Sequence, residues 1–232
     1  MEFMPEGPMA IPLWINGRAY LTASDAFFDV VNPSTGEALR RVPLSGQAEA
    51  LEAVAAARAA QPNWAAMGLM ARRVCLGNLA TALDNYRGHF AKLLVQDSGI
   101  EQVQAEAEVD AAVAALRDGG VGETGVFALL LGAEQPLAGF AQALAPALMA
   151  GATLVVKPSP KAPSAIYALC ELSGRCDWPG GVINLVQGDL AAVEGLCAAE
   201  VDRVVYAGAA PLAAALAEIA ARHGRPFVHQ AV

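Results

Sequence analysis

Short apolar stretches alternate with longer amphipathic ones along the second half of the chain. The short stretches favour buried strands, and they span residues 125–131, 153–156, 183–186, 203–206 and 226–229. The longer segments between them predict helices over residues 137–149, 164–173, 190–198 and 211–223. This alternation is typical of βαβ units, so we expect an α/β fold with a Rossmann-like parallel sheet flanked by helices.

The beginning of the chain has a different pattern. Residues 13–17 and 28–33 read as two short strands of a hairpin-like region, the first ending in an Asn16-Gly17 turn. Ser45 is a candidate N-cap for an alanine-rich helix that runs to Ala60, where Pro62 is expected to stop it.

A mainly helical segment follows and leads into the sheet. Residues 70–95 predict one or two helices that end at Gly99, and residues 101–117 predict another, closed by Gly119 and Gly120. No repeat or low-complexity linker interrupts the 232 residues. We therefore expect one domain over 1–232, with short strands and helices in 1–120 and the Rossmann-like part in 121–232.

Composition excludes several classes of function. The net charge is −8 and the Lys and Arg residues are scattered, so no basic surface is predicted for nucleic acid. The one long uncharged stretch, 135–156, is interrupted by Pro136, Pro146 and Gly151, which argues against a membrane span. Residues 1–9 lack a basic region followed by an apolar one, so no signal peptide is expected.

The four cysteines carry no recognisable metal or disulfide pattern. They are Cys75, Cys170, Cys176 and Cys197, with no CxxC pair and no nearby histidine spacing suited to zinc. We therefore expect free, mostly buried thiols in a reducing cytoplasm, and no metal site.

Several segments together resemble one enzyme family. Residues 151–159, preceded by Ala145 to Leu148, resemble the core of the cofactor domain in the aldehyde dehydrogenase superfamily, where PAL, two residues, GN and an apolar strand precede KPSE. Further similar segments occur in the family's order: Trp14 to Gly17, Asn32 to Gly36, Asp97 to Gly99, Glu108 to Asp110, Pro179 to Asn184 and Val204 to Gly208. The resemblance implies the family's cofactor-domain fold over nearly the whole chain.

The resemblance also implies a reaction, namely NAD(P)-dependent oxidation of an aldehyde through a cysteine thioester. The family's nucleophilic cysteine belongs to a second domain beyond the last predicted strand, so we expect that catalytic domain to be absent from this chain. Gln230 occupies the place of the general-base glutamate, and glutamine cannot accept a proton from water. Glu134 occupies the place of the oxyanion-donating asparagine, where a carboxylate would repel a developing oxyanion.

The implied cofactor contacts are only partly kept. Lys157 and Ser159 match the family's ribose-binding segment, but Pro160 replaces the glutamate that holds the ribose hydroxyls. Ala209 replaces a serine at the pyrophosphate, although Gly188 and Gly208 keep the strand-to-helix turns. NAD or NADP therefore remains a possible ligand rather than an expected one, because those glycines also serve ordinary turns.

Three hypotheses follow. The first is a non-catalytic structural, assembly or regulatory subunit, in which a second copy or a larger protein partner covers exposed sheet and helix faces. A short glycine-rich joint between Arg117 and Gly125, where the family has an antiparallel excursion used in assembly, also motivates it. The second is an NAD(P)-binding module or sensor. The third is the nucleotide-binding half of a split enzyme, which Glu134 and Gln230 argue against.

Overall fold

The computed structural model describes residues 8–20, 22 and 26–231, so most of segment 1–9 lies outside the described residues. The strands are β1 (Leu13–Ile15), β2 (Arg18–Tyr20), β3 (Phe27–Val31), β4 (Ala38–Pro43), β5 (Val126–Leu131), β6 (Thr153–Lys157), β7 (Ile183–Leu185), β8 (Arg203–Ala207) and β9 (Phe227–Gln230). The helices are α1 (Gln47–Ala66), α2 (Leu69–Asn85), α3 (Arg87–Ser98), α4 (Gln102–Asp118), α5 (Pro136–Met149), α6 (Ser164–Arg175), α7 (Leu190–Ala198) and α8 (Ala210–Arg222).

The central sheet has the order β2-β1-β7-β6-β5-β8-β9. Strands β5 to β9 are parallel to one another, and each successive pair in the sequence is joined by a helix. The predicted parallel sheet is therefore confirmed, with strand bounds within one or two residues of those expected. Strands β5, β6 and β7 are buried along their whole length by apolar side chains on both faces, as expected for the inner strands of a parallel sheet, whereas β9 at the edge is partly exposed.

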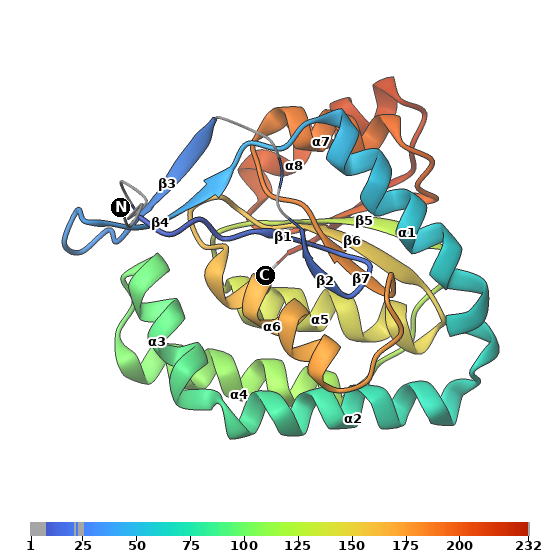
Figure 1. Cartoon of the computed structure of the whole chain (residues 1–232), viewed down its shortest axis with the longest axis horizontal. Helices are drawn as coiled ribbons and strands as arrows, with labels where there is room; N and C mark the ends of the chain where they lie inside the picture. The colour runs from blue at the N-terminus through green and yellow to red at the C-terminus, as the bar shows by residue number, and fades with distance from the viewer. Residues whose placement is uncertain (1–7, 21, 23–25, 232) are drawn as a thin grey trace, which may run out of the picture.

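Helices cover both faces of the sheet (Figure 1). One core joins α1, α7 and α8 to alternate strand residues, including Ala128, Val155 and Val204. The other core joins α5 and α6, with α2, α3 and α4 outside them, to the intervening residues such as Leu129 and Val156.

None of the helices in the described ranges is both long and apolar enough to cross a bilayer. The domain extent of 1–232 and a cytoplasmic location stay predictions.

The hairpin expectation near the start of the chain is wrong in its pairing. Strand β1 pairs through the Asn16-Gly17 turn with β2, a strand that the sequence pattern does not predict, and on its other side β1 joins the main sheet beside β7. Strand β3 pairs instead with β4 in a separate two-stranded sheet. Both missed strands carry arginines and are partly or fully exposed, so they lack the apolar pattern by which the other strands were recognised.

The first helix also differs from its expected bounds. Gly46, not Ser45, precedes it, and the Glu49 side chain accepts the Gly46 N–H at 3.0 Å. Pro62 lies inside the helix, which continues to Ala66. The last turn is held by tertiary packing, because Trp64 is fully buried and its ring stacks on Trp178 with centroids 5.4 Å apart. This packing offsets the one hydrogen bond that proline cannot make.

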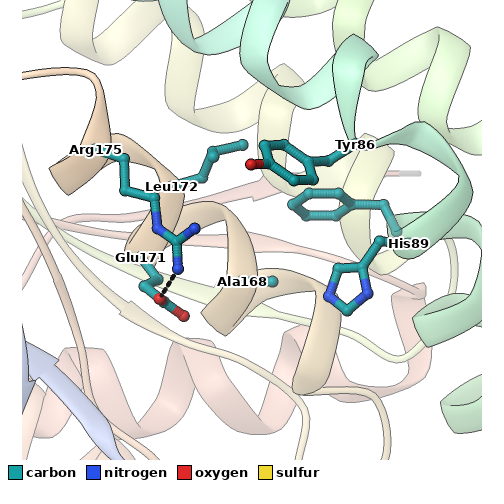
Figure 2. Close-up of a pocket in the computed structure, with 7 residues that line it drawn as sticks. Tyr86, His89, Ala168, Glu171, Leu172 and Arg175 are labelled. Atoms are coloured by element: carbon teal, nitrogen blue, oxygen red, sulfur yellow. Dashed lines mark hydrogen bonds and ion pairs between the residues drawn. The ribbon is translucent and has the colours of Figure 1, made fainter.

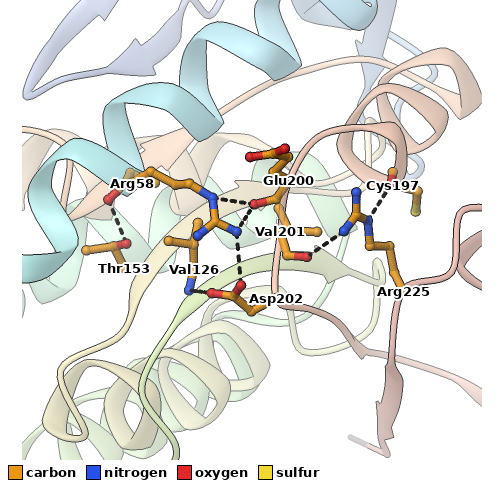
Figure 3. A network of polar contacts seen from close by, with 9 residues as sticks. Arg58, Val126, Thr153, Cys197, Glu200, Val201, Asp202 and Arg225 are labelled. Atoms are coloured by element: carbon orange, nitrogen blue, oxygen red, sulfur yellow. Dashed lines mark hydrogen bonds and ion pairs between the residues drawn. The ribbon is translucent and has the colours of Figure 1, made fainter.

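Two arginines hold the connection between α7 and β8 (Figure 3). Arg58 of α1 donates to the Glu200 carbonyl and pairs with Asp202 at 2.9 Å. Arg225 donates to the carbonyls of Cys197 and Val201. Asp202 also accepts the Val126 N–H at 2.8 Å, so this one carboxylate joins helix α1 to the start of β5. Although burial opposes ionisation, these donors hold the pKa of Asp202 below its usual range.

Replacing Asp202 by alanine should lower the free energy of unfolding by about 1–3 kcal/mol, because the Val126 N–H loses its acceptor. Chemical denaturation measures the change. Glu123→Ala is the matched control, since it removes an exposed ion pair to Arg203 and should cost about 0–1 kcal/mol. Equal losses in the two variants would contradict the role given to Asp202.

Candidate functional site

The sheet reverses its strand order at β5. The chain moves outward through β6 and β7, then returns to place β8 on the other side of β5. In open parallel sheets, ligands bind at the carboxyl ends of the strands at this reversal. Here those ends are followed by Gly132 and Gly208, and the Gly132 N–H donates to the Ala207 carbonyl at 2.8 Å. We call the space above these two glycines the crevice.

Glu134 and Tyr206 occupy the crevice. A Cβ placed on Gly132 would lie 2.7 Å from a Glu134 carboxylate oxygen, 3.0 Å from the Gly208 Cα and 3.4 Å from the Tyr206 hydroxyl. The hydroxyl of Tyr206 also lies where a Cβ on Gly208 would be, so it covers that turn. Burial, and next the charge of Glu134, raise the pKa of Tyr206, which keeps its proton. The crevice therefore holds a carboxylate and a neutral phenol.

The loop after β8 is fixed by side chains of the same region. The Tyr206 hydroxyl donates to the Ala209 carbonyl at 3.2 Å, and His229 Nε2 lies 2.8 Å from the Gly208 carbonyl. The two rings stack, with centroids 5.5 Å apart. Helix α8 then begins with Pro211 in its first turn, so one main-chain N–H that a phosphate could use is missing.

The amino end of helix α5, also near the crevice, is already hydrogen-bonded by a side chain of the protein. The Glu108 carboxylate of α4 accepts the Leu137 N–H at 2.7 Å and the Ala138 N–H at 3.3 Å, at the start of α5. Burial raises the pKa of Glu108 while these two donors oppose the rise. An anion from outside therefore finds the amino end of α5 already satisfied.

A cleft of about 210 Å³ extends from the crevice toward the end of β6. It brings together two of the predicted cofactor residues, Lys157 and Ser159, with Glu134 and Tyr206. The remaining lining is Leu130, Leu131, Gly132, Ala133, Pro160, Lys161, Val193, Leu212 and Leu216. The cleft thus combines two lysines, a serine, a glutamate and a tyrosine with walls that are largely apolar.

Lys157 is the buried cation of this cleft. The residue is 8% exposed, and it makes no ion pair within the described part of the chain. Burial lowers the pKa of Lys157 to about 8, while the charge of Asp189 opposes that change. Most copies therefore carry a positive charge near neutral pH, and that charge is desolvated, with Asp189 acting on it from beyond ion-pair distance.

The other predicted residues lie elsewhere. Gly188 is buried outside the cleft, and a Cβ placed on it would lie 3.0 Å from the Ser45 main-chain nitrogen. Gln230 ends β9, and its carbonyl accepts the Gly208 N–H at 3.2 Å. It lines a different hollow, beside Val228 and the outer face of α5. Gln230 and Glu134 are therefore not brought into one cavity by the described residues.

The four cysteines are free thiols whose pKa values are raised by burial. All four are free thiols, of which Cys170 and Cys197 are buried. Burial raises the pKa of each of them, to about 11 for Cys197, so thiolate is scarce near neutral pH. No group of three metal-ligating side chains forms within residues 8–20, 22 and 26–231.

A separate cavity of about 390 Å³ lies between the α2–α3 joint and α6 (Figure 2). Tyr86, His89 and Phe90 form one wall, and the other wall carries Glu171 and Arg175, which pair at 2.7 Å. None of the predicted site residues lines it. Its charged groups neutralise each other, so the structure offers no reason to place the site there.

The sequence patterns assign no role in the site to Tyr206, Pro211 or Glu108. Tyr206 could have been suspected, because it precedes the Gly208 turn by two residues and so shares a strand face with it. Pro211 was visible as a proline at a predicted helix start. The contacts of Glu108 with α5 join residues about thirty positions apart, and no local pattern indicates them.

Comparison with known proteins decides the family. The family model described as "Aldehyde dehydrogenase family" matches residues 20–119 and 124–230. The chain belongs to the aldehyde dehydrogenase family. Lactaldehyde dehydrogenase of Escherichia coli is 31% identical over 207 residues, covering 78% of this chain and 43% of the relative. Succinate-semialdehyde dehydrogenase [NADP(+)] of the same organism is 30% identical over 202 residues, covering 77% and 42%.

Solved structures of the family have the same fold. The E. coli lactaldehyde dehydrogenase crystal structure superposes with a TM-score of 0.91 at 25% identity, covering 97% of this chain and 52% of that one. An aldehyde dehydrogenase of Pseudomonas syringae, in complex with NAD+ and octanal, gives 0.90 at 25% identity, covering 99% and 51%. The chain thus spans about half the length of the relatives that it matches.

The residues of the cleft and the crevice match only some of the groups of NAD or NADP, the dinucleotide that the family uses. The Lys157 end of the cleft fits a sugar or phosphate group, since it offers a cation and a hydroxyl. The crevice fits a pyrophosphate less well, because the exposed carboxyl group of Glu134 lies beside it and Tyr206 covers the Gly208 turn. The fit of NAD or NADP is therefore partial.

Proposed function

We propose that this chain is a member of the aldehyde dehydrogenase family that does not oxidise aldehydes by itself and acts as a structural, assembly or regulatory subunit. The position of Glu134 carries the proposal. Its carboxylate lies beside Gly132 and Gly208, at the carboxyl ends of β5 and β8. A charge of this sign would destabilise an oxyanion formed nearby, where catalysis needs a hydrogen-bond donor.

Gln230 supports the same conclusion from another strand. It is aligned with the family's general base, yet an amide neither gains nor loses a proton near neutral pH. The two substitutions affect different steps, since one concerns the oxyanion and the other the activation of water. A single reversal would therefore not restore the reaction. The proposal rests on these residues and is independent of where the sequence begins or ends.

A nucleotide-binding module is the second candidate. Lys157 favours it, because a nine-tenths buried cation with no recorded ion pair among the described residues is costly unless something anionic approaches it. This function is compatible with the first, since a regulatory subunit can bind a nucleotide without transforming it. Half of a split enzyme is less well supported, because a cysteine supplied by another chain would still meet Glu134 and Gln230.

The purified chain should form no reduced cofactor when NAD or NADP is mixed with short, branched or aromatic aldehydes. The absorbance of the reduced nicotinamide measures this, with the E. coli lactaldehyde dehydrogenase as positive control. Glu134→Asn should be equally inactive, because Gln230 still cannot activate water. Aldehyde-dependent reduction by the unmodified chain, lost in a variant of one of its cysteines, would contradict the proposal.

We also propose that a second copy of the chain packs against the outer edge of β9. This strand ends the seven-stranded sheet and has no described partner on its outer side. Next to it lies a hollow of about 290 Å³ lined by Phe127, Leu129, Val205 and Val228, among others. Open strand edges beside apolar surface are common sites of association.

Light scattering should therefore give a mass above that of one chain, and Val228→Lys should reduce it to the monomer. Val228 is 41% exposed, so the substitution does not disturb a buried core position. Val103→Lys, on the exposed surface of α4, is the matched control and should leave the mass unchanged. A monomeric unmodified chain, or equal effects of both variants, would refute self-association through β9.

A further inference from the structure

The outer edge of β9 carries main-chain groups that no described strand uses. The carbonyls of Pro226 and Gln230 accept N–H groups of the β8 segment at 2.9 Å and 3.2 Å. Alternate residues of a strand direct their main-chain groups to the same side, so those of Val228 also face β8. The N–H and C=O groups of Phe227 and His229 therefore point outward. Because β9 ends the seven-stranded sheet, no strand in the described ranges pairs with them.

The sheet face beside this edge is apolar and open. Leu129, Val205 and Val228, from β5, β8 and β9, line the hollow of about 290 Å³ that lies against α5. Val228 is 41% exposed, and Val121, in the loop before β5, lines the same hollow and is 98% exposed. The aldehyde dehydrogenase family model leaves residues 120–123 unmatched, so this part of the lining is particular to this chain.

The charges around the edge do not oppose the approach of a second copy. Residues 227–231 contain no Asp, Glu, Lys or Arg. Arg203 and Glu123, which line the hollow, pair at 2.7 Å and neutralise each other. The ring of His229 is held in the crevice, where its Nε2 lies 2.8 Å from the Gly208 carbonyl. The edge thus lacks the charged side chains by which exposed strands commonly avoid pairing.

The direction and register of such a pairing follow from the outward-facing groups. Two identical edges related by a two-fold axis pair antiparallel, and each outward-facing residue must then meet an outward-facing one. The register with Val228 on the axis pairs Phe227 of each copy with His229 of the other and uses the whole of β9. Centring instead on Phe227 or His229 would pair residues beyond one end of the strand.

We infer that two copies join through antiparallel β9 strands with Val228 at the two-fold axis, so that two seven-stranded sheets become one continuous sheet. The inference rests on the proposal that a second copy packs against β9, and it specifies the partner strand, its direction and its register. The outward groups of Phe227 and His229 gain hydrogen-bond partners, and each Val228 packs against its own copy. The apolar hollows of the two copies then lie on the same face of the joined sheet.

Disulfide trapping of Val228→Cys tests the register. Antiparallel residues that face each other without ladder hydrogen bonds lie about 4.5 Å apart at Cα, within the range of a disulfide. With oxidised glutathione, Val228→Cys should run largely as a covalent dimer in non-reducing electrophoresis, and reduction should remove that dimer. The unmodified chain, treated in the same way, gives the background from the four native cysteines.

Gln230→Cys is the matched control. In the inferred register Gln230 lies opposite Pro226, so the two copies of residue 230 are about 14 Å apart along the strands and cannot form a disulfide. Only background trapping is expected. Equal trapping of Val228→Cys and Gln230→Cys would move the axis away from Val228 and overturn the register, as would the absence of trapping in a dimeric Val228→Cys chain.

Amide hydrogen exchange tests the same arrangement on the unmodified chain. The amides of Phe227 and His229 should be protected in the dimer and exchange at least about tenfold faster in monomeric Val228→Lys. The Gln230 amide, which faces β8, should stay protected in both. Free exchange of the His229 amide in the unmodified dimer would overturn the inference even if no cysteine variant folds.

These outcomes are distinguishable from failure of the proposal on which the inference rests. A monomeric unmodified chain in light scattering defeats self-association, and the inference with it. A dimer with a freely exchanging His229 amide keeps self-association but assigns it to another surface, which overturns the inference alone. Neither result bears on aldehyde oxidation, which is measured in a separate assay.

Discussion

Strand β5 lies between β6 and β8 and is hydrogen-bonded in parallel to both, and the rest of the structure depends on this arrangement. Because parallel strands all end at the same edge, the loops after β5, β6 and β8 converge there. Helices must cross from one strand to the next, so both faces of the sheet are covered. Any side chain placed just after β5 or β8 therefore lies at the position where this fold binds ligands.

This chain places Glu134 and Tyr206 at that position. Neither residue disturbs the fold, since the Gly132 and Gly208 turns still accommodate the loops and the sheet ladder continues past them. Their effect is chemical, because a carboxylate and a covered turn replace an open set of donors. A fold of the aldehyde dehydrogenase family is thus retained while a carboxyl group and a phenol lie at the carboxyl ends of β5 and β8. Family membership alone does not fix the reaction, which depends on these few side chains.

The sequence allowed the parallel sheet and its helices to be predicted closely, because each buried strand is a short apolar run between polar turns. Strands β2 and β4 were missed, since Arg18, Arg40 and Arg41 interrupt any such run. Pro62 was misread because the stacking of Trp64 on Trp178 is a tertiary contact that no local rule contains. In the same way, Glu134 and Lys157 could be aligned with the family, whereas the cover of Gly208 by Tyr206 required the three-dimensional structure.

A crystal structure of the chain grown with a saturating concentration of NADP+ tests the central claim most directly, because it locates the pyrophosphate relative to Glu134. The account predicts that no ordered pyrophosphate lies over Gly132 and Gly208, with the Tyr206 hydroxyl still donating to the Ala209 carbonyl. A dinucleotide whose pyrophosphate is bound by the main chain of Gly208 and Ala209, with Glu134 turned away, would contradict it.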